Sequence, residues 1–223
     1  MKTNIKSILK KGVMAMALAL CVVSCKDDTD ENVDTTVSLT LVNTVEGSSN
    51  QDFYLNDSKS NSNLSYGSSA SISTTTGTKT AVFKNTGSTT ANATTTVNIT
   101  ANSNQSLFFV KQADGSYSIN AYANENASTS GKAKVRFINV SSTLLAAVNV
   151  TTSTGTSLVS ALAFKAASAY QTIDANTSLN VNTTGSLETT TISGTEFQAG
   201  KVYTVWFDSA TTTKAKYHVI VQN

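Results

Sequence analysis

The feature that most constrains this chain is an alternation of apolar and polar residues with a period of two, which recurs from residue 37 to the C-terminal end. It is clearest in the segments 37–41, 97–99 and 217–221. Successive side chains of a strand point to opposite faces of a sheet, so this pattern predicts strands with one buried face. Glycine-containing turns separate the segments at intervals of roughly ten residues, which is typical of β-sandwiches and barrels. We therefore predict an all-β chain.

The chain also contains an internal repeat. An offset of 98 residues superposes three pairs of segments, namely 64–66 on 162–164, 87–88 on 185–186 and 107–109 on 205–207. Near the C-terminal end, an offset of 100 superposes 117–119 on 217–219, which indicates a small insertion. Each copy is long enough to bury a core of its own.

These two patterns predict two tandem antiparallel β-sandwich modules of the Ig-like or Greek-key type. Residues 36–123 form the first predicted module, residues 124–131 a polar linker and residues 132–223 the second module. Asp114-Gly115, which lies between two apolar segments, predicts a hairpin in the first module.

Residues 1–24 form a predicted secretory signal peptide. Four lysines precede an apolar stretch of eleven residues at 13–23, and this arrangement is typical of the leaders of exported proteins. Eleven helical residues cover only about half of the ~30 Å hydrocarbon core of a bilayer. We therefore favour a cleaved leader over the alternative, an N-terminal anchor helix.

Val22-Val23-Ser24-Cys25 resembles the lipobox of bacterial lipoproteins, in which the cysteine is lipidated and becomes the first residue of the mature chain. The resemblance implies that Cys25 anchors the protein in a membrane by two or three acyl chains, which hold more firmly than one. The leader removes four of the 16 basic residues, so 12 remain against 14 acidic ones and the net charge becomes −2 instead of +2. We therefore expect no nucleic-acid partner.

Residues 25–35 form a predicted acidic tether, because five acids occur between residues 26 and 34. Its opening residues, Lys26, Asp27 and Asp28, resemble the lipoprotein export signal of the Bacteroidetes. That resemblance implies a lipid-anchored place on the outer face of the outer membrane. The tether lacks the glycine and the glutamate that an EF-hand loop requires, so we predict no metal site there.

Four segments of the second module carry recognisable motifs: Lys-Val-Arg-Phe-Ile-Asn-Val-Ser at 134–141, Val-Asn-Val at 148–150, Leu-Ala-Phe-Lys-Ala-Ala-Ser-Ala-Tyr at 162–170 and Ala-Gly-Lys-Val-Tyr-Thr-Val at 199–205. Together they resemble the domain-of-unknown-function family 4397. The resemblance covers residues 133–223 well and residues 37–123 more weakly. The Ser-Pro-Asp-Ala-Pro that usually follows the family's opening strand is Ser-Ser-Thr-Leu-Leu here, so nothing about that loop is carried over. The resemblance implies the fold and a surface location, and no activity.

The sequence gives little support for catalysis, and we predict a non-enzymatic protein without a cofactor. His218 is the only histidine, and the alternation places it on the solvent face of the last strand. Cys21 leaves with the leader, so no Cys-His pair remains, and one histidine does not make a zinc site without several carboxylates. The carboxylates after the tether are dispersed singly, and no glycine-rich phosphate loop occurs.

The aromatic residues allow two interpretations. A flat ring can stack on a sugar, and we expect Tyr54, Tyr122, Tyr170 and Tyr203 to reach the surface most readily. Trp206 lies in an apolar run that we expect in a sandwich core.

Two positions resemble the acceptor motif for protein O-glycosylation in Bacteroidetes, an Asp followed by Ser or Thr and then a small or apolar residue. They are Thr35, which follows Asp34, and Ser209, which follows Asp208. The alternative for the second is that Asp208 and Ser209 begin a turn, because Asp side chains bond the local backbone.

We predict a non-catalytic cell-surface lipoprotein that acts by adhesion or by binding a glycan, a matrix component or a protein partner through its loops. The alternative is a structural subunit of the envelope or of a pilus. Bacteroidetes pilins are also lipoproteins with two β domains, and an arginine-directed protease trims their first strand. The only arginine here, Arg136, lies in the opening strand of the second module, which argues against such processing. The sequence specifies neither the ligand nor the oligomeric state.

External protease should remove this protein from intact cells, and the double substitution Asp27→Ala/Asp28→Ala should protect it, because the export signal is lost. Protease shaving followed by immunoblotting measures this, with a periplasmic protein as the control for leakage. If both forms are protected in sealed cells, the surface location is wrong.

Overall fold

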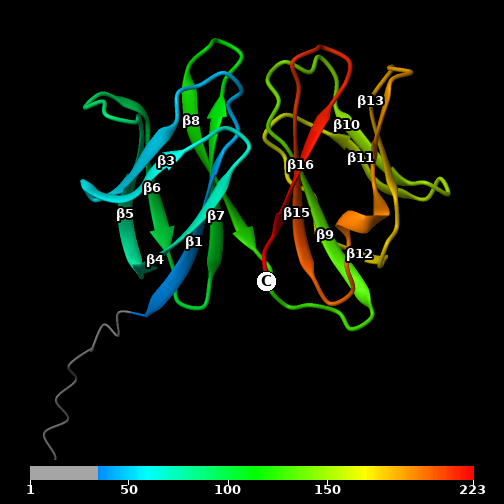
Figure 1. Cartoon of the computed structure of the whole chain (residues 1–223), viewed down its shortest axis with the longest axis horizontal. Helices are drawn as coiled ribbons and strands as arrows, with labels where there is room; N and C mark the ends of the chain where they lie inside the picture. The colour runs from blue at the N-terminus through cyan, green and yellow to red at the C-terminus, as the bar shows by residue number, and fades with distance from the viewer. Residues whose placement is uncertain (1–34) are drawn as a thin grey trace, which may run out of the picture. The chain divides into compact units, whose positions relative to one another are not determined.

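The computed structural model describes residues 35–223. Within this range the chain forms β-strands and one short 3-10 helix, η1 (Gly194–Glu196), so the all-β prediction is confirmed (Figure 1). The described part contains no helix that is long and apolar enough to cross a membrane. Several predicted features lie outside the described residues: the signal peptide 1–24, the lipidation site Cys25, and the export residues Lys26, Asp27 and Asp28.

The first module is a sandwich of two four-stranded sheets. Its strands are β1 (Thr36–Asn43), β2 (Gln51–Leu55), β3 (Ser58–Leu64), β4 (Ser69–Thr75), β5 (Gly77–Asn85), β6 (Ala91–Ile99), β7 (Asn104–Lys111) and β8 (Tyr117–Asn124). One sheet has the order β4-β1-β7-β8 and the other has the order β3-β2-β5-β6. The predicted hairpin joins β7 to β8, and the Asp114 carboxylate accepts a hydrogen bond of 2.9 Å from the backbone N–H of Ser116.

The second module repeats this arrangement. Its strands are β9 (Lys132–Asn139), β10 (Val148–Thr152), β11 (Ser157–Leu162), β12 (Gln171–Asp174), β13 (Leu179–Thr183), β14 (Thr189–Ile192), β15 (Val202–Asp208) and β16 (Lys216–Val221). One sheet has the order β12-β9-β15-β16 and the other has the order β11-β10-β13-β14. Each strand of the first module therefore has a counterpart eight strands later, and the predicted pair of repeated sandwich modules is confirmed.

The pairing registers keep the offset of 98 residues through the last hairpin. Phe109 lies opposite Ile119, and Phe207 lies opposite Tyr217. Ile119, not Tyr117, is therefore the counterpart of Tyr217. The predicted offset of 100 is wrong at this point, because the two hairpins pair in the same register and no insertion separates them.

Each module contains one parallel strand pair among its antiparallel ones, a feature that the predicted antiparallel sandwich did not include. β1 runs parallel to β7, with Leu41 opposite Leu107, and β9 runs parallel to β15, with Phe137 opposite Val205. The other strand pairs are antiparallel. A parallel pair requires a long crossover. The five strands between the two partners supply it in each module.

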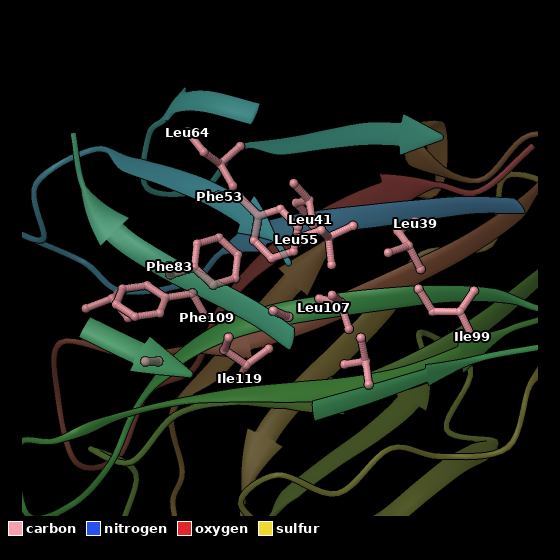
Figure 2. Packing of buried hydrophobic residues seen from close by; sticks show 14 of the residues in the cluster. Leu39, Leu41, Phe53, Leu55, Leu64, Phe83, Ile99, Leu107, Phe109 and Ile119 are labelled. Atoms are coloured by element: carbon pink, nitrogen blue, oxygen red, sulfur yellow. The ribbon is translucent and has the colours of Figure 1, made fainter. Parts of the chain in front are cut away.

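Each module buries an apolar core between its two sheets. In the first, Leu41, Phe53 and Phe83 are fully buried (Figure 2), and the rings of Phe53 and Phe83 lie 4.9 Å apart. In the second, Phe137 stacks on Phe207 at 6.1 Å. Burial of each such side chain contributes about 1.5–3 kcal/mol, so each sandwich has its own source of stability.

A third apolar cluster joins the two modules. Phe108 and Trp206, both fully buried, meet edge to face with centroids 6.4 Å apart. These two residues are counterparts in the repeat, and so are Val42 and Val140 of the same cluster. The modules therefore pack through equivalent faces, as the subunits of a two-fold dimer do. The cluster consists of Val42, Phe108, Val110, Ile138, Val140, Trp206 and Ile220.

This cluster corrects two expectations. Trp206 packs between the modules and not inside the second sandwich core. His218 is not on a solvent face, because its side chain is 23% exposed and its ring stacks on Trp206 at 3.8 Å. In both cases the face of β15 and β16 that points away from the sandwich core is covered by the other module.

Trp206→Ala should lower the free energy of unfolding by about 3–5 kcal/mol, because it leaves a cavity in the contact between the modules. Chemical denaturation followed by circular dichroism measures the loss. Leu187→Ala is the matched control, because Leu187 is fully exposed and its truncation should change stability by no more than about 0.5 kcal/mol. Equal free energies of unfolding for the two variants would contradict the role of Trp206 in the contact between the modules.

Candidate ligand-binding site

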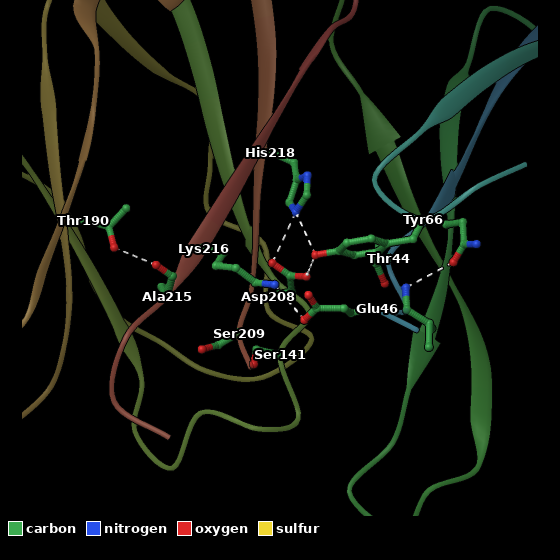
Figure 3. Close-up of polar contacts among 12 residues, drawn as sticks. Thr44, Glu46, Tyr66, Ser141, Thr190, Asp208, Ser209, Ala215, Lys216 and His218 are labelled. Atoms are coloured by element: carbon green, nitrogen blue, oxygen red, sulfur yellow. Dashed lines mark hydrogen bonds and ion pairs between the residues drawn. The ribbon is translucent and has the colours of Figure 1, made fainter. Parts of the chain in front are cut away.

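A polar cluster lies where the two modules meet. Tyr66 comes from the turn between β3 and β4, Asp208 ends β15, and His218 lies in β16. The Tyr66 hydroxyl donates a short hydrogen bond to Oδ2 of Asp208 and lies 3.3 Å from Nε2 of His218. His218 Nε2 is also 3.3 Å from Oδ1 of Asp208 (Figure 3). The three side chains thus close a triangle of contacts across the junction.

The position of the His218 ring is fixed from three sides. It stacks on Trp206 with an interplanar angle of 6° and meets the ring of Tyr66 edge to face at 5.5 Å. Gly67 allows this approach, because a Cβ atom there would lie 3.3 Å from the imidazole. Its φ of +77° also favours glycine.

The electrostatics of the cluster favour a carboxylate that is held by donors. Burial raises the pKa of Asp208, but the nearby His218 and the hydrogen bond from Tyr66 lower it, and the net pKa lies below the usual value. Burial and the neighbouring Asp208 carboxylate raise the pKa of the Tyr66 phenol. Tyr66 is therefore a protonated donor at neutral pH and not a phenolate nucleophile.

A second ionic contact crosses the junction beside this cluster. Lys216 Nζ lies 2.6 Å from Oε2 of Glu46, which belongs to the turn after β1 (Figure 3). The same ammonium lies 5.6 Å from the centre of the Tyr66 ring. Both side chains are nearly half exposed, so this pair contributes at most about 1 kcal/mol.

A groove of about 560 Å³ opens next to the cluster, and its surface is mostly apolar. Tyr66, Tyr217 and His218 supply aromatic rings, and Thr190, Lys214 and Lys216 supply polar groups. The volume lies in the range of small-ligand sites. The Thr190 hydroxyl donates a 2.6 Å hydrogen bond to the Ala215 carbonyl, which ties β14 to the loop before β16.

The loop that follows Asp208 is organised by Ser209. This residue is only 8% exposed, its hydroxyl accepts a 3.0 Å hydrogen bond from the N–H of Thr211, and it donates a short one to the carbonyl of Lys214. Glycosylation at Ser209 stays a prediction, and it would require this loop to open or the modification to precede folding.

Thr35, the other predicted acceptor, lies directly before β1. Its carbonyl accepts a 3.2 Å hydrogen bond from the N–H of Thr76, and the residue is partly buried. Its glycosylation also stays a prediction.

The tyrosines that we expected near the surface differ in burial. Tyr203 is 2% exposed and its hydroxyl accepts from the N–H of Gln198, so that expectation is wrong for Tyr203. Tyr122 is partly buried and donates a 3.0 Å hydrogen bond to the Lys165 carbonyl, and burial raises its pKa to about 12. Tyr54 and Tyr170 are also partly buried.

Sequence reasoning did not single out Tyr66 and Asp208 as a pair, because they are 142 residues apart. A signal was present in the unbroken apolar runs 107–110 and 205–207, which depart from strict alternation. Such runs indicate strands that are buried on both faces. They therefore mark the junction beside which the cluster forms.

The asparagine of the family-like opening motif has a structural role in both modules. Asn139 Nδ2 donates to the Leu162 carbonyl at 3.1 Å, and its Oδ1 accepts from the N–H of Ser141 at 3.0 Å. Asn43 makes the same two bonds in the first module, at 3.1 Å each. These residues hold the end of the first strand and do not contribute to the groove. Among residues 35–223, no group of three or more His, Cys, Asp and Glu side chains is placed to hold a metal ion.

Tyr66→Phe should lower the free energy of unfolding at pH 7 by about 1.5–3 kcal/mol, because Asp208 loses a donor. The pKa of Asp208 should then rise towards 3.8, its ordinary value. Because folding lowers the pKa of Asp208, its carboxylate stabilises the fold above the ordinary pKa of 3.8, and this contribution is lost as the pH falls further. The difference between the variants should therefore shrink below pH 3.8.

Chemical denaturation at pH 7 and at about pH 3 checks both parts of this expectation. Tyr217→Phe is the matched control, because its hydroxyl makes no hydrogen bond within residues 35–223. A difference that is the same at both pH values would rule out the role of Asp208.

Three comparisons with known proteins bear on this fold. No curated protein matches the chain. Among solved structures, it is similar to a carbohydrate-binding module of family CBM26 from Eubacterium rectale Amy13K in complex with maltoheptaose, with 12% identity over 84% of this chain and 98% of that chain. The TM-score is 0.29, which does not establish a shared fold.

The family comparison is more informative. The model of the domain of unknown function DUF4397 matches residues 37–151. That range contains the first module from its second residue onward, where the motifs are weaker, and it contains β9 and all but the last residue of β10 in the second. Because the match spans more than half of the 223 residues and the strands of both modules follow one plan, the chain belongs to the DUF4397 family.

Proposed function

We propose that this protein is a non-catalytic, lipid-anchored surface protein that binds an uncharged sugar of a glycan in the groove beside Tyr66. The observation that carries the proposal is the groove itself. It has a mostly apolar surface, three aromatic rings and a few polar groups at its border. This combination is the usual form of a small-ligand site.

The chemistry of the groove suits a sugar better than a charged ligand. The rings of Tyr66, Tyr217 and His218 line the groove, and an aromatic ring is the kind of surface on which a pyranose stacks. The Tyr217 hydroxyl makes no hydrogen bond to any described residue, so it is available to a ligand. The charge of Lys216 is offset by Glu46, so of the two lysines that line the groove only Lys214 has no ion-pair partner among residues 35–223.

The arrangement of polar groups argues for binding without catalysis. The Tyr66 hydroxyl is committed to Asp208, and the carboxylate of Asp208 faces Tyr66 and His218. Ser209, the nearest hydroxyl that follows Asp208 in the chain, bonds within its own loop. Nucleophilic catalysis needs a nucleophile within reach of an open base. The hydroxyls of Tyr66 and Ser209 are already bonded within the protein, so neither forms such a pair with a base.

The proposed location rests on the sequence. Lipidation at Cys25 would hold the protein in the outer membrane, and the acidic residues Asp27 and Asp28 would direct it to the exterior. The binding of glycans then fits a protein that faces other cells, the matrix or a host surface.

The alternative function as a pilus-type subunit is disfavoured by one observation. Arg136 is 3% exposed, and its guanidinium bonds to Ala123, Asn124 and Thr204. An arginine-directed protease would therefore find no accessible arginine among residues 35–223, because Arg136 is the only arginine of the chain.

Purified full-length protein should bind at least one immobilised neutral glycan, and Tyr217→Leu should weaken that binding about 10-fold or more, equivalent to about 1.4 kcal/mol. Leucine keeps the apolar packing of Tyr217 and removes its ring and hydroxyl. A glycan array identifies the ligand, and calorimetry with that glycan measures the change.

Tyr54→Leu is the matched control for this comparison. Tyr54 is a partly buried tyrosine of β2 and does not line the groove. Its replacement should leave binding unchanged. Equal loss in both variants, or no retention of the wild type on any neutral glycan, would overturn the proposal.

A further inference from the structure

A second groove, of about 380 Å³, lies where the end of β8 meets β9 and the loop before β12. Arg136 of β9 contributes a guanidinium to its lining, and Tyr170 contributes a ring. We propose that this groove binds the carboxylate of an acidic sugar, with Arg136 and Tyr170 as its ligands. The site is separate from the groove beside Tyr66, and it does not rest on the function proposed for that groove.

The first argument is the charge of Arg136. The residue is only 3% exposed, yet no Asp or Glu within residues 35–223 forms an ion pair with it. Its acceptors are neutral: the Ala123 carbonyl, Oδ1 of Asn124 and, at 2.9 Å, Oγ1 of Thr204. Glu125 attracts the guanidinium electrostatically but forms its ion pair with Lys134, so Arg136 has no anionic partner in direct contact. Buried charges in proteins are normally paired, so this arrangement indicates a place for an anion.

The second argument is the unused hydrogen-bonding capacity. A guanidinium has five N–H donors, and the three bonds to Ala123, Asn124 and Thr204 use three of them. The Tyr170 hydroxyl accepts from the N–H of Glu125 at 3.3 Å and donates to no described residue. Three hydrogens are therefore left for the oxygens of a ligand. A carboxylate matches the planar fork of arginine.

The third argument is the shape and composition of the groove. Ala123, Ala167 and Ala169 are exposed and have small side chains, so they leave open space beside the guanidinium. The ring of Tyr170 lies 5.1 Å from the Arg136 guanidinium carbon and holds it in place. Glu125, the one acidic residue of the lining, is paired with Lys134. A sugar ring that carries the carboxylate fits this space and meets the aromatic ring of Tyr170.

Calorimetry on the full-length protein with sodium glucuronate tests the proposal, with glucose as the neutral probe and sodium chloride added to equalise ionic strength. We expect saturable binding of glucuronate. In the Ala210→Trp variant, where the groove beside Tyr66 is filled, we expect no heat beyond dilution from glucose, and equal heats from the two sugars in that variant would overturn the proposal. N-acetylglutamate carries a carboxylate on an amino-acid frame, and binding of it as tight as that of glucuronate would overturn the assignment to a sugar.

Arg136→Gln should abolish glucuronate binding, but this variant removes a buried side chain that also holds Ala123 and Asn124. Ala169→Trp keeps the guanidinium contacts and fills the groove from an exposed position, so it should weaken glucuronate binding at least about 10-fold. Ala210→Trp is the matched control, because Ala210 is also exposed and lines the groove beside Tyr66 but not the groove at Arg136. It should leave glucuronate binding unchanged while it blocks the neutral glycan. Unchanged binding in Ala169→Trp would overturn the proposal.

Discussion

The contact between Phe108 and Trp206 is the interaction on which the rest of the described structure depends. Each module has its own core, but the junction between them exists because the central strands β7 and β15 present aromatic side chains away from their cores. Removal of these two rings from water is favourable by about 25 cal/mol for each Å² of apolar surface. Both grooves take their walls from both modules, so neither would keep its shape if this contact opened.

The duplicated plan explains why the candidate site occurs on only one side of the junction. The counterparts of Tyr66, Asp208 and His218 are Phe164, Val110 and Asn120, which lack the hydroxyl, the carboxylate and the imidazole. The two modules present the same strands at the junction, and the apolar cluster covers only part of each of these faces. Positions at the border of the contact are therefore free to differ, and the polar cluster formed where one copy diverged from the other.

The fold was largely predictable from local patterns, whereas the site was not. Alternation in segments such as 37–41 and the offset of 98 residues are local or translational signals, and both are kept in the structure. The solvent face predicted for His218 failed because alternation reports only that one face of a strand is buried, not what covers the other. The unbroken apolar runs at 107–110 and 205–207 indicated that both faces of these strands are buried, because a strand with one buried face needs an apolar residue only at every second position. The pairing of Tyr66 with Asp208 could not be predicted, because it depends on how the two modules dock.

A low charge density makes this docking decisive for the proposed binding. Only 13% of the residues are charged, so long-range attraction contributes little and a ligand must be held by contact within a groove. A ligand that touches both modules binds the docked arrangement and not the separated one, and it therefore stabilises docking by mass action. Arg136 illustrates this relation, because its side chain leaves β9 of the second module and bonds the carbonyl of Ala123 at the end of the first. An anion bound to that guanidinium would reduce the cost of burying its charge, and it would thereby strengthen the same contact that shapes the groove.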